Sequence, residues 1–135
     1  MHKHILIPVA LDHEGVVVNK IAAARRLLDE GGKITLLTVL EDIPGFVAEL
    51  VPSKPENHLT ARIKAHLDKI AGGAEDIGTE VVTGKPGLKV SEYARQHEVD
   101  MIIVGSHKPG VQDYFLGSTA SRISRRAPCS VMIIR

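Results

Sequence analysis

Two glycine-containing clusters near the carboxyl end of the chain have residue types suited to binding an anion. Gly105-Ser106-His107 follows an apolar run, and Gly117-Ser118-Thr119 opens a segment with helical spacing. Glycine lets a ligand approach the backbone, and a Gly-Ser-Thr helix start offers free N–H groups and two hydroxyls where the helix dipole favours negative charge. Phosphate is the anion most often held this way, but the same residues also make an ordinary helix cap. Both interpretations are open from the residues alone.

Other phosphate-binding and nucleophilic motifs do not match the sequence. The segment after the first apolar run reads IPVALDHEG, which is neither a P-loop nor a Gly-x-Gly-x-x-Gly dinucleotide loop. Ser106 lies in Val-Gly-Ser-His-Lys rather than in a Gly-x-Ser-x-Gly nucleophile elbow. Because Ser106 and His107 are sequence neighbours, they are poorly placed to act as nucleophile and base. Hydrolase chemistry is therefore a minor alternative, with no assembled catalytic residues.

The seven histidines do not show the spacing of a metal site. His58 and His66 lie eight residues apart, whereas two ligands on one helix need a separation of three or four. His2 and His4 belong to a predicted sheet edge or chain terminus. We expect most histidines to be solvated and no metal to be bound. His107 differs because it lies on the ligand-facing turn, where contacting a ligand and packing the turn are both open.

Short apolar runs rich in branched side chains alternate with segments of helical spacing, which predicts an α/β fold with a parallel sheet. Strands are expected at Ile5–Val9, Ile34–Leu40, Glu80–Thr83, Met101–Val104 and Val131–Ile134. The last helix is expected at Ser118–Arg126, ending before Pro128. This order predicts a single doubly wound five-stranded parallel sheet with helices on both faces.

Glycines and prolines mark the ends of the other three helices. Their inner faces are expected to carry Ile21, Ala24 and Leu28, then Leu59, Ile63, Leu67 and Ile70, and then Val90, Ala94 and His97. The first helix should stop at Gly31-Gly32, and the second should run from a cap at Asn57 to Gly72-Gly73. The third should begin at Pro86.

The predicted sheet itself selects candidate ligand-binding turns. In an open parallel sheet, ligands bind outside the carboxyl ends of the strands, where the strand order reverses. This rule selects Pro8-Val9-Ala10, Val39-Leu40 and Gly105-Ser106-His107. Residues 41–57, with three prolines, form a long connection that is predicted to be a flap or functional loop, with a helical turn near Phe46–Val51.

Composition predicts one domain over residues 1–135 and disfavours nucleic acid and membranes as partners. A chain of 135 residues that is 44% hydrophobic can bury a core. The net charge of +1 gives no basic stripe, and the absence of Trp, with two Tyr and two Phe, leaves few surfaces for base stacking. No segment approaches the ~20 apolar residues of a membrane helix.

The amino-terminal segment and the single cysteine both favour a cytoplasmic location. MHKHILIPVALD has too short an apolar run for a signal peptide and leads into an acidic turn. Cys129 cannot form an internal disulfide, and we expect it to be a small buried hydrophobe rather than a reactive thiol.

Several segments together resemble the universal stress protein family over essentially the whole chain. They are HILIPV, ITLLTVLED, TGKP, DMIIVGSHKPG, LGSTASRISRRAPCSV and MIIR, in the order and spacing of that family. Its nucleotide-binding branch carries a glycine, two residues, a second glycine, nine residues and then Gly-Ser or Gly-Thr. Gly105 and Gly117-Ser118 match the ends of that pattern. The Ser-His-basic-Pro version resembles small bacterial members that bind ATP, with a Rossmann-like fold of the adenine nucleotide alpha hydrolase type.

The resemblance implies that ATP or another adenine nucleotide, with Mg²⁺ left open, binds at the candidate turns. The implied nucleotide-binding residues are Pro8, Val9 and Val39 for adenine, Ala10 and Gly105 for ribose, and Lys108, Gly117, Ser118 and Thr119 for phosphate, with Val104, Ser106 and His107 beside them. It also implies a homodimer through Val131–Ile134 that acts as a stress-response regulator or sensor. An apolar strand at the chain end needs such a cover.

Three features depart from the ATP-binding pattern of that family. Lys108 replaces the second glycine, only eight residues separate it from Gly117, and Ala10 replaces an aspartate, with Asp12 two places further on. Lys108 can supply charge to phosphate or point to solvent. One hydrogen bond lost at Ala10 would cost about 0.5 to 3 kcal/mol of binding. A nucleotide-free dimeric interaction module is therefore the alternative, and a nucleotide-processing enzyme that uses His107 is a third.

Overall fold

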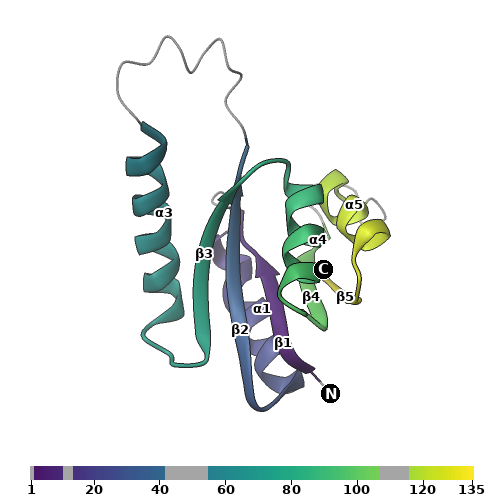
Figure 1. Ribbon diagram of the computed structural model, residues 1–135. Coiled ribbons are helices and arrows are strands. Elements are labelled where there is room, and N and C mark those ends of the chain that lie inside the picture. The colour runs from purple at the N-terminus through teal and green to yellow at the C-terminus, as the bar shows by residue number, and fades with distance from the viewer. Residues whose placement is uncertain (1, 11–13, 42–54, 107–115) are drawn as a thin grey trace.

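The strands form one parallel sheet whose order places the first strand at its centre. The computed structural model describes residues 2–10, 14–41, 55–106 and 116–135. Its strands are β1 (His2–Pro8), β2 (Leu28–Leu40), β3 (Ile77–Thr83), β4 (Met101–Gly105) and β5 (Ser130–Ile134). All pair in parallel, in the order β3-β2-β1-β4-β5 (Figure 1). The predicted five-stranded, doubly wound parallel sheet is confirmed.

The helices cover both faces of this sheet, as predicted. Helices α1 (Glu14–Leu27) and α3 (Pro55–Ala71) pack on the face to which Ile5 and Ile7 point. Helices α4 (Pro86–Gln96) and α5 (Ser118–Arg126) pack on the face to which Leu6 and Ile102 point. Successive strand residues point to opposite faces, so the central strands bury side chains on both faces of the sheet. Burying each such side chain stabilises the fold by about 1.5–3 kcal/mol.

The connection between α1 and β2 differs from the expected one. The helix ends at Leu27, and Gly31-Gly32 lies inside β2 rather than after the helix. Leu28 already pairs with His2, and the register shifts between His2 and His4. Gly31 has a φ of +80°, which glycine adopts without steric cost. The two glycines therefore form the irregular start of a strand, and the prediction of a helix stop there was wrong.

Helix α3 also begins differently from the prediction. It starts at Pro55, so Asn57 lies within the helix and not at its cap. Ile63 and Leu67 are buried, but Leu59 is 48% exposed and does not belong to the core. The helix packs mainly on the edge strand β3, so the sheet covers only part of its apolar face.

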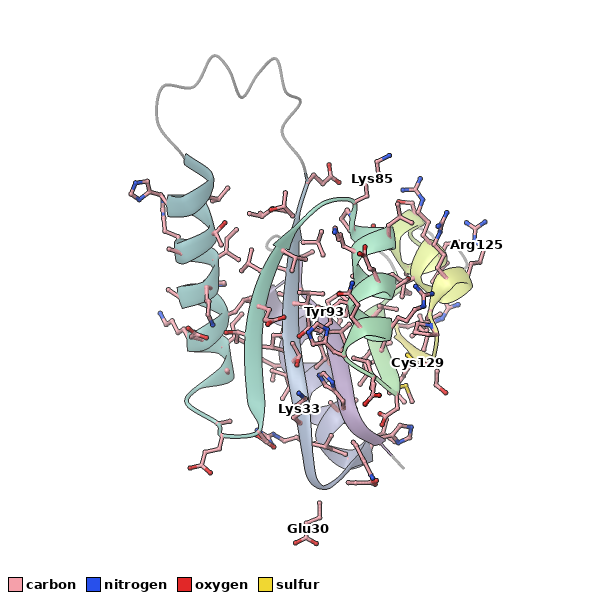
Figure 2. The ribbon with its side chains drawn as sticks, in the orientation of Figure 1. Glu30, Lys33, Lys85, Tyr93, Arg125 and Cys129 are labelled. Atoms are coloured by element: carbon pink, nitrogen blue, oxygen red, sulfur yellow. The ribbon has the colours of Figure 1, made fainter. Side chains whose placement is uncertain are left out.

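The ends of α4 and α5 agree closely with the prediction. Helix α4 begins at Pro86, a favourable first helical position, with Val90 and Ala94 buried. His97 caps the end of this helix, and its ring stacks on Tyr93 at 3.8 Å. Helix α5 has the predicted bounds, and its Arg125 points away from the body of the molecule (Figure 2).

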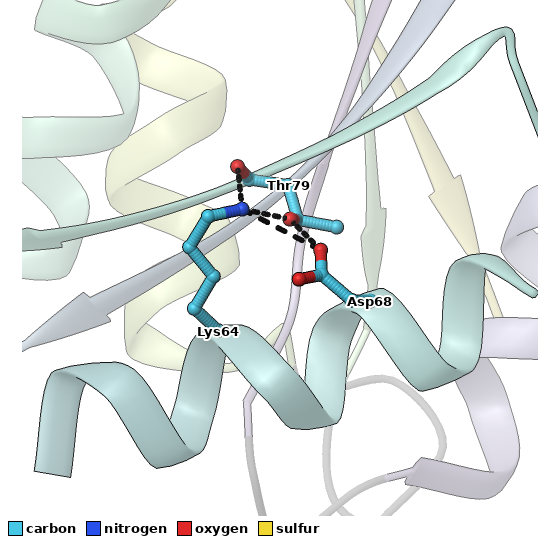
Figure 3. A network of polar contacts seen from close by, with 3 residues as sticks. All are labelled: Lys64, Asp68 and Thr79. Carbon is cyan, nitrogen blue, oxygen red and sulfur yellow. Dashed lines mark hydrogen bonds and ion pairs between the residues drawn. The ribbon is translucent and has the colours of Figure 1, made fainter. Parts of the chain in front are cut away.

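A polar network fixes α3 to the edge strand. Nζ of Lys64 donates to the Thr79 carbonyl at 3.2 Å and lies 2.7 Å from the Thr79 hydroxyl, which donates to Asp68 (Figure 3). These side chains are exposed, and exposed ion pairs of this kind typically contribute ~0.2–1 kcal/mol. The network positions α3 on β3 and lies outside the candidate ligand site.

The structure describes the expected flap only in part, and it bears on the expectation about membrane helices. The proposed helical turn at Phe46–Val51, like most of the predicted flap, lies outside the described residues. Within the part of the chain that is described, no helix is long and apolar enough to cross a membrane.

Candidate functional site

The strand order reverses direction between β1 and β4. From β1 the chain winds outward to β2 and β3, and then crosses back to β4 and β5 on the other side. Helices that follow the two halves lie on opposite faces, and ligands of open parallel sheets generally bind outside the carboxyl ends of the strands at such a reversal point. Pro8, Val9 and Ala10 follow β1 here, and Gly105 and Ser106 lie at the end of β4.

The turn after β1 is held firmly to the neighbouring strand. The Val9 N–H donates to the Leu37 carbonyl at 2.8 Å, and the buried Thr38 hydroxyl donates to the Val9 carbonyl at 3.0 Å. Val9 is buried, Pro8 is half-buried and Ala10 is exposed. The turn therefore presents a fixed backbone at its Ala10 end. Thr38 was not predicted, although a threonine within an apolar strand run is a recognisable sign of such a bond.

Ser106 brings the two glycine clusters together. Its N–H donates to the Ile134 carbonyl at 3.0 Å, and its carbonyl accepts from the Gly117 N–H at 2.6 Å. Ser106 is buried, so this link lies beneath the surface of the site. Residues separated by a long connection in the sequence thus adjoin at the end of β4, as the candidate site requires.

The start of α5 presents backbone N–H groups beside the end of β4. Gly117 is the residue before the helix, and the first bond within the helix runs from the Ser121 N–H to the Gly117 carbonyl at 2.9 Å. The N–H groups of Ser118 and Thr119 precede that bond and have no acceptor within the helix. Both residues are exposed, so their hydroxyls and N–H groups face solvent.

Val39 and Val104 are apolar residues near the carboxyl ends of β2 and β4. Val39 is half-buried near the carboxyl end of β2, whereas Val104 is buried in the core beneath α4 and α5. Val39 therefore keeps part of its apolar surface accessible, whereas Val104 belongs to the core. His107 and Lys108 lie outside the described residues, as does Asp12.

Lys20 of α1 is a charged residue of this region that the sequence analysis did not select. It is only 7% exposed, and a β-carbon added at Gly105 would lie 3.6 Å from both its Cε and its Nζ. Burial lowers the pKa of the Lys20 ammonium from its ordinary value. Lys20 follows the buried Val17 by three residues and precedes the buried Ala24 by four, which places it on the inner face of α1. That helical spacing from apolar residues was the sequence signal that could have identified Lys20 as an inward-facing residue.

His4 contradicts the expectation of a solvated histidine at a sheet edge. It lies on the central strand and is 4% exposed, with Nδ1 3.1 Å from the His97 carbonyl and Nε2 2.8 Å from the Thr35 hydroxyl. A carbonyl only accepts, so Nδ1 carries the proton and Nε2 accepts from Thr35.

Within the described residues, no group of three or more His, Cys, Asp or Glu side chains could hold a metal.

Cys129 is half-buried beside the core on the α4–α5 face. Burial, together with the charge of Asp100, raises the pKa of its thiol, which disfavours the reactive thiolate. This agrees with a packing role.

Comparison with known proteins identifies the family. The family model described as the universal stress protein family matches residues 1–135. The chain belongs to the universal stress protein family. Universal stress protein G of Salmonella typhimurium strain LT2 is 28% identical over 144 residues, with 100% of both chains covered. The resemblance seen in the sequence is therefore confirmed.

Solved structures share the fold of this universal stress protein. Protein MJ0577 of Methanocaldococcus jannaschii has a TM-score of 0.79 at 24% identity, covering 99% of this chain and 96% of its own. A universal stress protein solved in complex with cAMP has a TM-score of 0.67 at 21% identity, covering 99% of this chain and 97% of its own. At these identities the likeness establishes the fold, which is the Rossmann-like α/β arrangement predicted from the sequence.

Proposed function

We propose that this universal stress protein binds ATP or another adenine nucleotide at the carboxyl ends of β1 and β4. The observation that carries the proposal is the bond between Ser106 and Gly117, which brings the free N–H groups of α5 to the reversal point of the sheet. A helix N-terminus beside a close backbone approach at Gly105 is a general anion-binding arrangement. The related protein solved with cAMP supports an adenine nucleotide as the ligand.

Each part of the nucleotide has a proposed position. Adenine lies against Val39 and the Pro8-Val9 turn, and the ribose lies near Ala10 and Gly105. The phosphates lie against the Gly117 backbone at the start of α5 and receive hydrogen bonds from the N–H and hydroxyl groups of Ser118 and Thr119. Lys108 and His107 remain proposed contacts whose position lies outside the described residues, and Mg²⁺ is left open.

We further propose that the protein is a cytoplasmic homodimer joined through β5, with nucleotide binding acting as its stress-response signal. Strand β5 is an edge strand, and its Ile133 is 39% exposed. An exposed apolar edge of this kind is a template for pairing with another strand. Beside it lies a hollow of about 330 Å³, lined by Met132 and by five residues of α1: Asn19, Ala22, Ala23, Arg26 and Leu27. A second copy would cover both features.

A nucleotide-free dimeric interaction module is the second candidate function, and Ala10 favours it. Ala10 is exposed at the end of the β1 turn and has no side chain that could bond a ribose or a metal. In that case β5 would still pair, and partner proteins rather than nucleotides would be recognised.

Native mass spectrometry of the freshly purified protein separates the two candidates. We expect a dimer that carries the mass of one adenine nucleotide per chain, and calorimetric titration of the stripped protein should then return ATP binding. A dimer without bound nucleotide that also gives no heat with ATP, ADP or AMP would support the interaction module and refute nucleotide binding.

A further inference from the structure

Lys20 is a buried cation for which the described part of the chain shows no acidic partner. Its side chain is 7% exposed on the inner face of α1, between the buried Val17 and Ala24. Burying an ammonium group without a partner is costly, and proteins usually pair such a group with a carboxylate. Among the residues that the structure describes, no acidic side chain forms an ion pair with Lys20, and burial alone accounts for its lowered pKa.

The end of this side chain lies at the candidate site. Its Cε and Nζ would each lie 3.6 Å from a β-carbon added at Gly105, so the ammonium lies against the backbone at the end of β4. The space in front of Gly105 is where glycine permits a ligand to approach. The charge of Lys20 is therefore directed at the same turn that the nucleotide is proposed to occupy.

A second source of positive potential lies on the other side of the same turn. Ser106 follows Gly105, and its carbonyl holds Gly117 at the start of α5 at 2.6 Å. The helix dipole and the free N–H groups of Ser118 and Thr119 favour an anion there. The Gly105-Ser106 turn thus has an ammonium from α1 beside it and a helix N-terminus from α5 bonded to it.

We propose that Lys20 determines the charge specificity of the site, by placing its ammonium against a phosphate bound over Gly105. For the adenine part of the ligand this inference rests on the proposed function, but the charge selection is a property of Lys20 itself. Lys20 makes the site favour a phosphorylated ligand over its uncharged form. Because no described acidic side chain offsets this buried charge, we expect Lys20 to cost stability in exchange for selectivity.

The test measures ATP, adenosine and inorganic tripolyphosphate binding by calorimetry with the full chain and three variants. Lys20→Met keeps the length of the side chain and removes the charge, and Lys20→Arg restores a charge. Lys69→Met removes one charge from the exposed last turn of α3 and is the control. We expect Lys20→Met to weaken ATP at least about tenfold and adenosine by less than about twofold, whereas Lys20→Arg keeps most of the ATP affinity.

A thermal melt without ligand gives a readout that a purely structural lysine would not. Removing a buried charge that no described acidic side chain offsets should raise the melting temperature of Lys20→Met by about 2–5 °C, whereas loss of a structural contact would lower it. A ratio of ATP to adenosine affinity that is unchanged in Lys20→Met would overturn the inference and leave the proposed function standing. Lys20-dependent tripolyphosphate binding without any adenine specificity would support the inference and refute the proposed function. A wild-type protein that binds none of the three ligands refutes both.

Discussion

At the scale of single residues, the buried polar groups are the most informative features of this protein. Lys20 and His4 are both nearly inaccessible to solvent, but His4 has two hydrogen-bond partners whereas no described side chain pairs with Lys20. A buried polar group with protein partners usually serves the fold, and a buried charge beside a ligand-facing turn is a candidate for function. The two residues therefore belong to different classes, although both looked like ordinary polar side chains in the sequence.

His4 should make the stability of the fold depend on pH. Burial, aided by the charges of Lys33 and His97, lowers the pKa of His4 below its ordinary value of 6.5 despite the bond to the His97 carbonyl and the nearby Asp100. The unfolded chain then binds more protons than the native one, so the contribution of His4 is complete above pH 6.5 and is lost as the pH falls through the folded pKa. The loss is at most about 1.4 kcal/mol per pH unit.

Urea denaturation at pH 7.5 and at pH 5 measures this contribution. We expect the wild-type protein to lose more stability between the two conditions than His4→Gln, which cannot titrate. His58→Gln, at an exposed position of α3, should behave as the wild type does. Equal losses in the wild type and His4→Gln would show that His4 does not carry the pH dependence.

At the scale of elements, the start of α5 is the part of the candidate site that the sequence defined best. The helix has the predicted bounds because Gly117 and Pro128 mark both ends locally. The start of β2 could not be predicted in the same way. Its first residue, Leu28, is in the sheet because it pairs with His2, a contact between distant parts of the chain. The glycine pair Gly31-Gly32 resembles a helix C-terminal stop signal, so the sequence predicted a helix end there instead.

The same distinction explains which site residues were found. Gly105, Ser106 and Gly117 were selected because glycine and hydroxyl residues at strand and helix ends have a local meaning. Lys20 depends on which face of α1 meets β4, and that follows from the tertiary packing. A lysine three and four residues from buried apolar positions was the only local sign of it.

A substitution at Gly117 tests the role of the α5 start. Gly117 has a φ of −57° and a ψ of 153°, which any residue can adopt, so Gly117→Val should leave the fold intact. The added side chain would cover the N–H groups of Ser118 and Thr119. We expect ATP affinity to fall at least about tenfold, with an unchanged circular dichroism spectrum and melting temperature.

Gly78→Val is the matched control for this change. Gly78 lies on β3 with no atom within 4 Å of an added β-carbon, and β3 is at the far edge of the sheet from α5. Calorimetry should show wild-type ATP affinity in Gly78→Val. If Gly117→Val also binds ATP as the wild type does, the phosphate does not lie at the start of α5.

At the scale of the whole molecule, the strand order decides where a second copy can bind. β3 and β5 are the two edge strands, and α3 is tied to β3 through Lys64, Asp68 and Thr79 (Figure 3). The opposite edge, at β5, has the half-exposed Ile133 and the hollow beside Met132. The exposed apolar side chain and the hollow make the β5 edge the one where we expect the dimer to form.

A charge at Ile133 should separate the two copies. Ile133 is 39% exposed, and Ile133→Asp would bring two carboxylates into an apolar contact, so we expect the dimer dissociation constant to rise at least about a hundredfold. Light scattering during size-exclusion chromatography and sedimentation velocity measure this. Leu88→Asp introduces the same charge on α4 at a residue that is 43% exposed, and it should remain dimeric. Circular dichroism checks that both variants fold, and a folded Ile133→Asp protein that remains dimeric would place the interface away from β5.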